Sequence, residues 1–477
     1  MKKYILLFCL FSISLISIGQ KEDLSSIWSA KWIKSTIGPE KEFAVFHFRK
    51  TFDLDTIPEN LVINTSGDNR YRLYVNDKYV CQGPLTGDLR HWNYETTDIK
   101  PFLCRGKNVI SVTVLNYGSH PPDARLSVQT GFLLNADDKK FSFLNTNQTW
   151  KAVYDRAYSA NIIDKSQING YYGGGSREIV DGNKYIWDFS NTDLDDTLWD
   201  NAVVIENAFA KSCIWASRWK LTPRKLPTER LTVQRFQSVR MADKLSIPVS
   251  FPKSKADVYI PSNSKVRLVL DQGMETTAYP VLEISDGKNA SIKMTYCEAA
   301  YIGNPQEQNK GNRNDVEGKT FFGYYDKYIS DGGQNRKYSP LWWRAFRYVV
   351  LDIETQSSPL VINDLHSVLS TYPFDQKSKF SITGEIDKVM IDSIFNIGIR
   401  TIQLCSHETY VDCPYYEESQ FEGDTRVEML ASYYNFGDAR LAENAIEQFA
   451  WSINDEGFLS ARYPTNSLYY IPNFSIY

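Results

Sequence analysis

The spacing of the apolar residues changes once along this 477-residue chain, and that change limits what the chain can fold into. Up to about Pro373, short segments such as residues 108–115 alternate apolar and polar positions between Gly, Pro, Asn and Asp turns. Beyond Pro373, apolar residues recur every three or four positions. Alternation buries one face of a strand, whereas the wider spacing buries one stripe of a helix. The chain is therefore predicted to be β in its first three quarters and helical afterwards.

The β part divides into two predicted antiparallel β-sandwiches, at residues 20–227 and 228–373. In the first, Asn76-Asp77 separates two alternating runs and predicts a hairpin turn. Pro223 to Pro227 reads as a linker, and the clearest strands of the second part are residues 266–270, 290–297 and 346–353. Residues 374–477 then carry the helical spacing through three runs, the first over Ile386, Met390, Ile394, Ile397, Thr401 and Leu404, the second from Asp424 and the third from Ala439.

The first 19 residues have the pattern of a secretory signal peptide. Two lysines precede an unbroken apolar run, and small residues lead to a cut expected between Gly19 and Gln20. No later run approaches 18 apolar residues, so no membrane association is expected after cleavage. The predicted location is secreted or periplasmic.

The composition limits the classes of binding partner that can be expected. The net charge is −4, and it becomes −6 when the two lysines of the leader are removed, so neither nucleic acid nor an anionic membrane surface is an expected partner. Aromatic residues make up 14% of the chain, which suits both β-sandwich cores and flat apolar ligands such as sugar rings. The six cysteines outside the leader contain no CxxC pair and are too sparse for a disulfide scaffold.

The densest group of chemically active residues is the segment 406–424, where carboxylates and His407 are interleaved with aromatic residues. Pro414 prevents one continuous helix there. Glycoside cleavage needs one carboxyl group that stays protonated near neutral pH and a second carboxylate, and apolar surroundings with like-charged neighbours raise a carboxyl pKa in the required way. The alternative from composition alone is a solvated loop in which Asp424 caps the following helix.

Other motifs are weaker. The aspartate-rich residues 191–200 lack the glycine that a calcium loop needs at its sixth position, which is Asp196. The histidines do not pair at zinc spacing, and neither a phosphate-binding loop nor a nucleophile elbow is present. The Trp-rich residues 342–348 could stack on sugars, but core packing is the favoured interpretation.

Residues 408–417, Glu-Thr-Tyr-Val-Asp-Cys-Pro-Tyr-Tyr-Glu, followed by Gly-Asp-Thr-Arg at 423–426, resemble the active-site signature of the α-L-rhamnosidases of glycoside hydrolase family 78. Further similarities run along the mature chain in the same order, at residues 68–76, 91–92, 106–109, 311–318, 331–333 and 340–344. The resemblance implies two N-terminal antiparallel β-sandwich domains, the first carbohydrate-binding-like, followed by the start of an (α/α)6 catalytic barrel.

The resemblance also implies an inverting exo-enzyme that removes terminal α-L-rhamnose from glycans or glycosides. By the family spacing, Glu417 is the general acid, with Glu418 as the fallback. Asp412 and Asp424 are then expected to accept hydrogen bonds from rhamnose hydroxyls, and Phe421 to stack on the sugar. No cofactor is expected, although calcium in the first sandwich is left open without named ligands.

The helical part is short for a full barrel, because residues 375–477 provide only 103 positions. We expect the water-activating glutamate of the family to lie beyond residue 477, activity of this form to be impaired and some apolar helix faces to lack partners. The alternative is a non-catalytic secreted carbohydrate-binding protein, and release of p-nitrophenol from an α-L-rhamnoside would distinguish the two.

Overall fold

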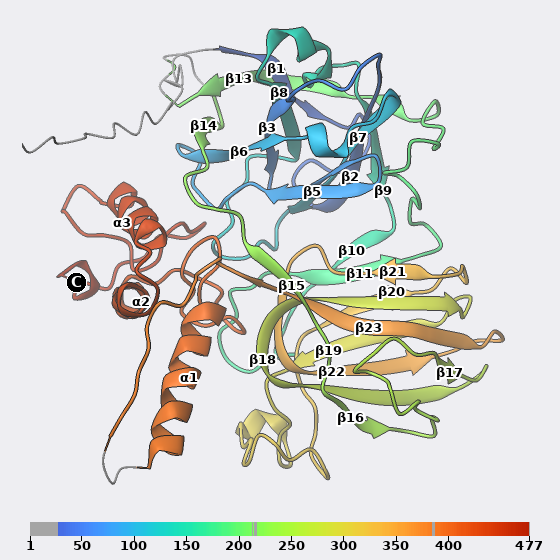
Figure 1. Cartoon of the computed structure of the whole chain (residues 1–477), viewed down its shortest axis with the longest axis vertical. Coiled ribbons are helices and arrows are strands. Elements are labelled where there is room, and N and C mark those ends of the chain that lie inside the picture. The colour runs from blue at the N-terminus through green and yellow to red at the C-terminus, as the bar shows by residue number, and fades with distance from the viewer. Residues whose placement is uncertain (1–26, 212, 214–216, 384–386, 477) are drawn as a thin grey trace, which may run out of the picture.

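A computed structural model describes residues 27–211, 213, 217–383 and 387–476. The expected signal peptide, residues 1–19, lies outside these ranges. Two β regions are stacked one above the other, and three α-helices lie along one side of them (Figure 1).

The first β region consists of a six-stranded closed barrel and a six-stranded sheet. The barrel contains β1 (Ile27–Lys34), β13 (Val203–Ala210), β14 (Lys220–Pro223), β6 (Trp92–Asp98), β3 (Val62–Asp68) and β8 (Gly131–Ala136). The sheet contains β12 (Asp200–Asn201), β9 (Lys151–Asp155), β2 (Phe43–Leu54), β7 (Gly106–Tyr117), β4 (Arg70–Val75) and β5 (Lys78–Gly83). The predicted hairpin is confirmed, since Asn76 and Asp77 join β4 to β5 with φ of 50° and 65°, as a tight two-residue turn requires.

Strand β7 alternates apolar and polar residues, yet neither of its faces is exposed to solvent. Nearly all its residues are buried. Val112 and Val114 pack into the core of the first region, while Leu115 and Tyr117 reach the core shared with the second. The sheet is therefore covered on both faces and joins the two β regions.

The second β region is one eleven-stranded sheet that folds over itself. Its strands are β10 (Tyr158–Asn161), β11 (Arg177–Asp181), β15 (Arg230–Gln234), β16 (Ser238–Ala242), β17 (Val258–Ile260), β18 (Lys265–Asp286), β19 (Ser291–Cys297), β20 (Tyr325–Ile329), β21 (Arg336–Tyr338), β22 (Arg344–Glu354) and β23 (Leu360–Thr371). The 22-residue β18 makes the fold-over possible: its first part pairs with β16 and β22, its last part pairs with β23, and the register shifts between Asp271 and Thr276. The Trp342 and Trp343 side chains lie in the core, as expected.

Two details differ from the sequence prediction. Strands β10 and β11 fall inside the span expected for the first sandwich, residues 20–227, but they join the second sheet because β11 pairs with β20. The first region is also not purely antiparallel, since β14 runs parallel to both β13 and β6. Pairing of this kind is set by distant strands, so local alternation carries no signal for it.

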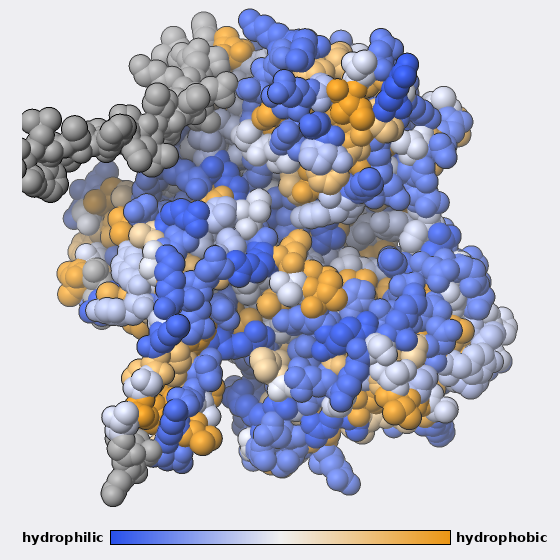
Figure 2. Space-filling model, in the orientation of Figure 1, coloured by the Kyte–Doolittle hydropathy of each residue, from blue (hydrophilic) through white to orange (hydrophobic). Residues whose placement is uncertain are grey.

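The predicted helices are α1 (Lys388–Leu404), α2 (Glu422–Phe436) and α3 (Arg440–Trp451). Ile386, the first residue of the predicted periodic run, lies outside the described residues. The α1 side chains Val389, Ile394 and Ile397 are 76%, 59% and 65% exposed. Figure 2 shows this apolar surface along α1. The architecture, β regions followed by helices, is the one predicted, and none of the described helices is long and apolar enough to cross a bilayer.

Candidate active site

The segment between α1 and α2 forms a folded loop that its own backbone closes. Asp412 and Ser419 bond to each other twice, since the Asp412 N–H donates to the Ser419 carbonyl at 3.0 Å and the Ser419 N–H to Asp412 Oδ1 at 3.3 Å. The Glu418 N–H donates to the Cys413 carbonyl at 3.1 Å, and Glu418 takes the left-handed conformation with φ of 51°. Pro414 lies at the start of this turn, as its restricted backbone favours.

The alternative of a solvated loop capped by Asp424 is wrong. Residues 404–411 and 418–420 are buried, because the loop is enclosed by both β regions and the helices. Helix α2 begins at Glu422, with Phe421 at the N-cap position and no side-chain cap. Asp424 therefore lies in the first turn, where a carboxylate interacts favourably with the helix dipole.

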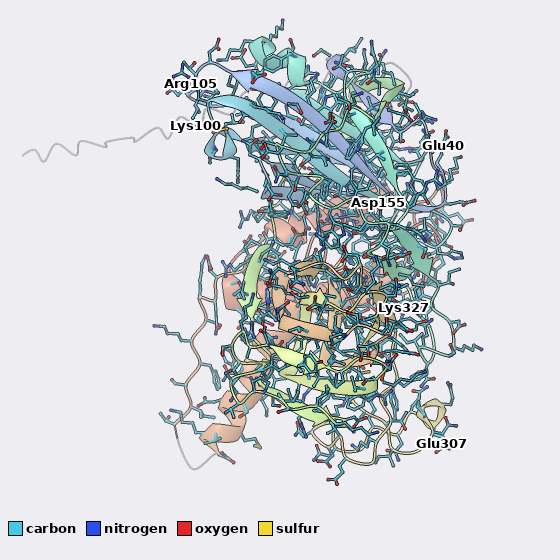
Figure 3. The ribbon with its side chains drawn as sticks, turned by 90° about the vertical axis from the view of Figure 1, so that its right-hand side faces the viewer. Glu40, Lys100, Arg105, Asp155, Glu307 and Lys327 are labelled. Carbon is cyan, nitrogen blue, oxygen red and sulfur yellow. The ribbon has the colours of Figure 1, made fainter. Side chains whose placement is uncertain are left out.

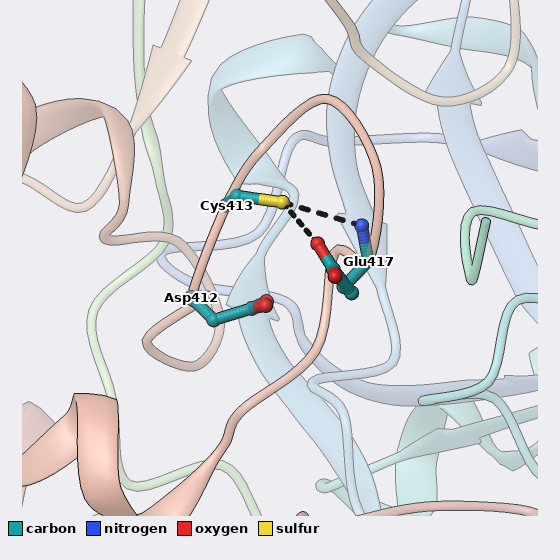
Figure 4. Close-up of side chains that lie close together, drawn as sticks. All are labelled: Asp412, Cys413 and Glu417. Atoms are coloured by element: carbon teal, nitrogen blue, oxygen red, sulfur yellow. Dashed lines mark hydrogen bonds between the residues drawn. The ribbon is translucent and has the colours of Figure 1, made fainter. Parts of the chain in front are cut away.

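Glu417 points back across the loop toward Asp412 and Cys413 (Figure 4). The Cys413 thiol donates to Glu417 Oε2, and the Glu417 N–H donates to Cys413 Sγ at 3.4 Å. One carboxylate oxygen of Asp412, one of Glu417 and the Cys413 sulfur all lie within 4.8 Å of one another. The proposed acid and one of the proposed sugar ligands are thus neighbours.

We call Asp412, Glu417, Asp424 and Glu428 the acid cluster. Burial and the charge of Glu417 raise the pKa of Asp412 to about 8. Partial desolvation and the same charge raise the pKa of Asp424, which is otherwise exposed, and burial with the charges of Asp424 and Asp412 holds the pKa of Glu428 well above its usual range. Burial and neighbouring negative charge thus favour the protonated forms of Asp412, Asp424 and Glu428.

The neighbouring glutamate, Glu418, has a different environment. Arg177 Nη2 donates to Glu418 Oε1 at 2.6 Å, and Trp342 Nε1 donates to Oε2 at 3.2 Å. Both oxygens are therefore occupied by groups of the second β region, and the side chain is buried. The geometry favours Glu417 over Glu418 as the group that can reach a substrate.

Glu408 is a structural anchor that sequence reasoning did not single out. It accepts two bonds from Arg70, at 2.6 and 2.9 Å, another from Arg125 at 3.2 Å and two from Thr86. Burial opposes its ionisation, but the charges of Arg70 and Arg125 outweigh burial and hold the pKa of Glu408 well below its usual range. This buried ion pair fixes the start of the loop to the first β region.

The aromatic part of the site gathers around Arg462. Its guanidinium lies 5.8 Å from the ring centre of Phe421 and 5.2 Å from that of Tyr469, and Phe421 meets Tyr469 edge-on at 6.3 Å. Arg462 Nη1 donates to Asp123 Oδ2 at 2.6 Å and also bonds to Tyr171. Phe421 is partly exposed, so one side of it remains available for a ligand.

The structure thus brings Asp412, Glu417, Asp424 and Phe421 to one loop and its helix. It adds Asp123, Tyr171, Arg462 and Tyr469, which no local motif could have linked to this loop. Asp123 lies in the turn-rich stretch 118–123, more than 280 positions from Asp412, and only the fold makes them neighbours. That turn-rich stretch was the one available hint.

Within the described residues, Asp412, Cys413 and Glu417 form the one group with spacing suited to a metal ion. The donor set does not fit calcium, which takes six to eight oxygen ligands. Burial and the charge of Asp412 also raise the pKa of the Cys413 thiol, which keeps it protonated. This group lies outside the first sandwich, where the sequence left calcium open.

The chain is similar in sequence and fold to known proteins. Residues 379–474 match the family described as the bacterial alpha-L-rhamnosidase six-hairpin glycosidase domain. A rhamnosidase of glycoside hydrolase family 78 from Bacillus sp. GL1 superposes with a TM-score of 0.77 at 16% identity, over 94% of this chain and 66% of the other.

Two further solved structures are similar. The α-L-rhamnosidase of Aspergillus terreus has a TM-score of 0.66 at 17% identity, over 92% of this chain and 47% of its own. The Streptomyces avermitilis α-L-rhamnosidase, solved in complex with L-rhamnose, has a TM-score of 0.59 at 16% identity, over 89% and 38%. No curated protein sequence matched the chain.

The two β regions, the helices and the carboxylate loop together have the fold of solved α-L-rhamnosidases, which are glycoside hydrolases. More particularly, the resemblance to the family 78 α-L-rhamnosidases is confirmed to this extent: residues 379–474 match the model of the rhamnosidase six-hairpin glycosidase domain, and the described part of the chain shares the fold of these enzymes. The chain spans about two thirds of the Bacillus enzyme and less than half of the other two.

Proposed function

We propose that this chain carries the acid side of the active site of an inverting, exo-acting α-L-rhamnosidase that hydrolyses terminal α-L-rhamnose from glycans or glycosides. One observation carries the proposal: a carboxylate oxygen of Asp412 lies within 4.8 Å of one of Glu417, and burial with the charge of Glu417 raises the pKa of Asp412 to about 8. A pair of carboxyl groups that keeps a proton at neutral pH is what protonation of a glycosidic oxygen requires.

In this proposal Glu417 hands the shared proton to the glycosidic oxygen as the bond from that oxygen to the anomeric carbon breaks. Water attacks the opposite face of the sugar and leaves its own proton on a general base. The Cys413 thiol, which donates to Glu417 Oε2, fixes the carboxyl rotamer and leaves the other oxygen to face the substrate. Asp412 resupplies the proton, since one of its carboxyl oxygens lies within 4.8 Å of one of Glu417.

The remaining predicted site residues are proposed to bind the sugar. Asp424 is exposed at the first turn of α2 and is available to accept hydroxyl hydrogen bonds, together with Asp412. Phe421 offers an aromatic face beside Tyr469. A rhamnose ring, with one apolar face and several hydroxyls, matches that combination.

The substitution Glu417→Gln tests the assignment. It removes the acidic group but keeps the size of the side chain, so hydrolysis of a rhamnoside with a poor leaving group should fall at least about 100-fold. Loss on p-nitrophenyl rhamnoside should be much smaller, because that leaving group needs little protonation. Rhamnose binding, measured by calorimetry, should stay within a few-fold of the parent, whereas Asp424→Ala should weaken it.

Glu443→Gln is the matched control, since Glu443 is exposed on α3 away from the loop. It should leave both rates and binding unchanged. Equal losses on activated and unactivated rhamnosides in Glu417→Gln would contradict the role of general acid. Weakened rhamnose binding in that variant with unchanged rates would instead make Glu417 a sugar ligand.

Three further points belong to the proposal. We propose that these 477 residues bind rhamnose but hydrolyse rhamnosides at an impaired rate. We propose that no cofactor takes part.

We also propose export to the periplasm or the medium, on the pattern of residues 1–19. Mass spectrometry of the exported chain would test this proposal by showing Gln20 at its N-terminus.

A further inference from the structure

The second β region carries a groove whose lining includes no residue of the acid cluster. A cavity of about 510 Å³ lies over β18, β19, β20 and β22, and a second of about 250 Å³ adjoins it and shares Arg267, Lys293, Tyr325 and Asp352. Phe321 and Phe322 close one end. These volumes are in the range of ligand sites.

The sheet register sets the residues of this groove in rows. Lys327 on β20 is directly opposite Lys293 on β19, which is opposite Asp352 on β22, which is opposite Arg267 on β18. The next row toward the open end holds Ser291, Glu354 and Lys265. Residues two apart on a strand share a face, so both rows point into the same groove. Figure 3 labels Lys327 in the lower β region.

The pairing of Lys293 with Lys327 is unfavourable in the absence of a ligand. Like charges directly opposite each other on neighbouring strands destabilise a sheet. Arg267 pairs with Asp352 at 2.6 Å and Lys265 with Glu354 at 3.0 Å, whereas neither Lys293 nor Lys327 forms an ion pair within the described part of the chain. Both lysines are partly buried in the groove. A cost of this kind is compensated when an anion lies between the two ammonium groups.

The aromatic ring at the closed end holds one of these lysines in place. Lys293 Nζ lies 4.4 Å from the ring centre of Tyr325, within the range of a cation–π contact. Tyr325 is two positions before Lys327 on β20, so all three side chains share one face. The ammonium group is thereby positioned before any ligand arrives, which lowers the entropy cost of binding.

The charge balance of the groove indicates the class of ligand. Lys265, Arg267, Lys293 and Lys327 face Asp243, Asp352 and Glu354, which leaves one positive charge in excess. A phosphate-rich ligand would meet three carboxylates. In a sugar ring with a single carboxylate, the carboxylate can lie between the two lysines, and the hydroxyls can form hydrogen bonds with the other polar groups of the groove.

We propose that this groove is a binding site for an acidic oligosaccharide, with the carboxylate of a uronic acid residue held between Lys293 and Lys327. The site is separate from the acid cluster and needs no catalysis. The groove thus provides a glycan-binding surface on the same chain as the proposed rhamnosidase site. Binding there would hold the chain on an acidic polysaccharide.

Calorimetry on the full chain tests the site with trigalacturonate as the probe, at 50 mM NaCl. Trigalacturonate should bind at least tenfold more tightly than its fully methyl-esterified form, and 0.5 M NaCl should weaken the binding because the contact is electrostatic. Lys327→Gln and the double substitution Lys293→Gln/Lys327→Gln should each lower the affinity, the double at least tenfold. Lys253→Gln, at an exposed lysine outside the groove, should not change it.

Thermal unfolding of the same variants separates binding from folding. Lys327→Gln relieves the like-charge pair, so its unfolding midpoint without ligand should equal or exceed that of the parent. A lower midpoint would make the lysine structural and overturn the inference. Equal binding of the free and esterified forms, unchanged affinity in the double variant or equally tight binding of sulfate would each overturn it too. Rhamnoside hydrolysis plays no part in these measurements, so their outcome does not depend on the role proposed for Glu417.

Discussion

Asp412 is the residue at which burial, charge and backbone structure meet. Its backbone and one carboxylate oxygen close the loop through Ser419, and its carboxyl group lies beside Glu417. Burial and the charge of Glu417 raise its pKa to about 8. The folded protein therefore holds a proton there that the unfolded chain releases near pH 4.

This difference makes a prediction about pH and stability. Between about pH 4 and pH 8 the Asp412 carboxyl group binds more protons in the folded state than in the unfolded state, so its contribution to stability falls as pH rises through this window. Asp412→Asn cannot ionise and escapes this loss. At pH 8 relative to pH 4 the variant should gain about 1–3 kcal/mol over wild type, measured by urea unfolding at both values.

Asp375→Asn is the control for that measurement, because Asp375 is largely exposed and pairs only with Arg230 at the surface. Its stability should follow the wild-type pH curve. If Asp412→Asn also runs parallel to wild type from pH 4 to pH 8, then Asp412 is ionised throughout and the proton is held elsewhere in the cluster.

The sequence separated Glu417 from Glu418 only by motif spacing, and the structure shows why spacing alone could not do more. The two carboxylates are adjacent in sequence, yet one bonds to Cys413 inside the loop and the other to Arg177 and Trp342. Arg177 is some 240 positions away. The chemical difference between neighbours comes from partners that local composition does not encode.

At the scale of elements, the helices were predictable from apolar residues spaced three or four apart, although in α1 most of these residues are exposed and only Ile399 and Leu404 are buried. Helix α2 ends at Gly437, whose φ of 62° and N–H bonds to the Ser432 and Tyr433 carbonyls form a left-handed cap. The length of β18 was not predictable, since 22 residues pair successively with four strands and only the whole sheet fixes where each pairing stops.

Two glycines of these helices should respond in opposite directions to alanine. An added Cβ at Gly437 finds open space apart from Lys377, so Gly437→Ala tests the left-handed backbone alone and should cost about 1 kcal/mol. Gly398 lies inside α1 with nothing within 4 Å of an added Cβ. Gly398→Ala should therefore stabilise the protein by about 0.5–1 kcal/mol.

Chemical denaturation followed by circular dichroism measures both glycine variants. Their opposite signs provide the internal control, since the substitution is the same. A loss of stability in Gly398→Ala would mean that the exposed face of α1 is in contact with other protein in solution, and that the surface seen along this helix is covered there.

At the scale of the whole molecule, the candidate site is held from several sides. Glu408 is bound by arginines of the first β region, Glu418 by Arg177 of the second, and Arg462, which follows α3, by Asp123. The Gly173 N–H also donates to the Tyr416 carbonyl at 2.8 Å, and a Cβ at Gly173 would lie 2.6 Å from the Glu417 carbonyl oxygen. The acid loop thus takes its shape from segments far away in sequence, which explains why the sequence indicated the loop but not its surroundings.

The bond between Asp123 and Arg462 allows this dependence to be measured. Asp123 touches neither Glu417 nor Phe421 in the contacts described above; it holds Arg462, which in turn lies against Phe421 and Tyr469. Asp123→Asn should therefore act as loss of positioning, weakening rhamnose binding about 5- to 20-fold while leaving the pH profile of hydrolysis unchanged. Arg462→Gln should weaken binding by a similar factor.

A double-mutant cycle then separates positioning from general destabilisation. If Asp123 acts through Arg462, the double variant should bind about as well as the weaker single variant, which gives a coupling energy of about 1–2 kcal/mol. Asp164→Asn is the control, since Asp164 lies in an exposed turn and, among the described residues, forms no hydrogen bond or ion pair with Asp123 or Arg462. It should not change binding and should add independently to Arg462→Gln. Additive losses for Asp123 and Arg462 would show that the two residues act separately, and that the first β region supports the sugar site by some route other than this ion pair.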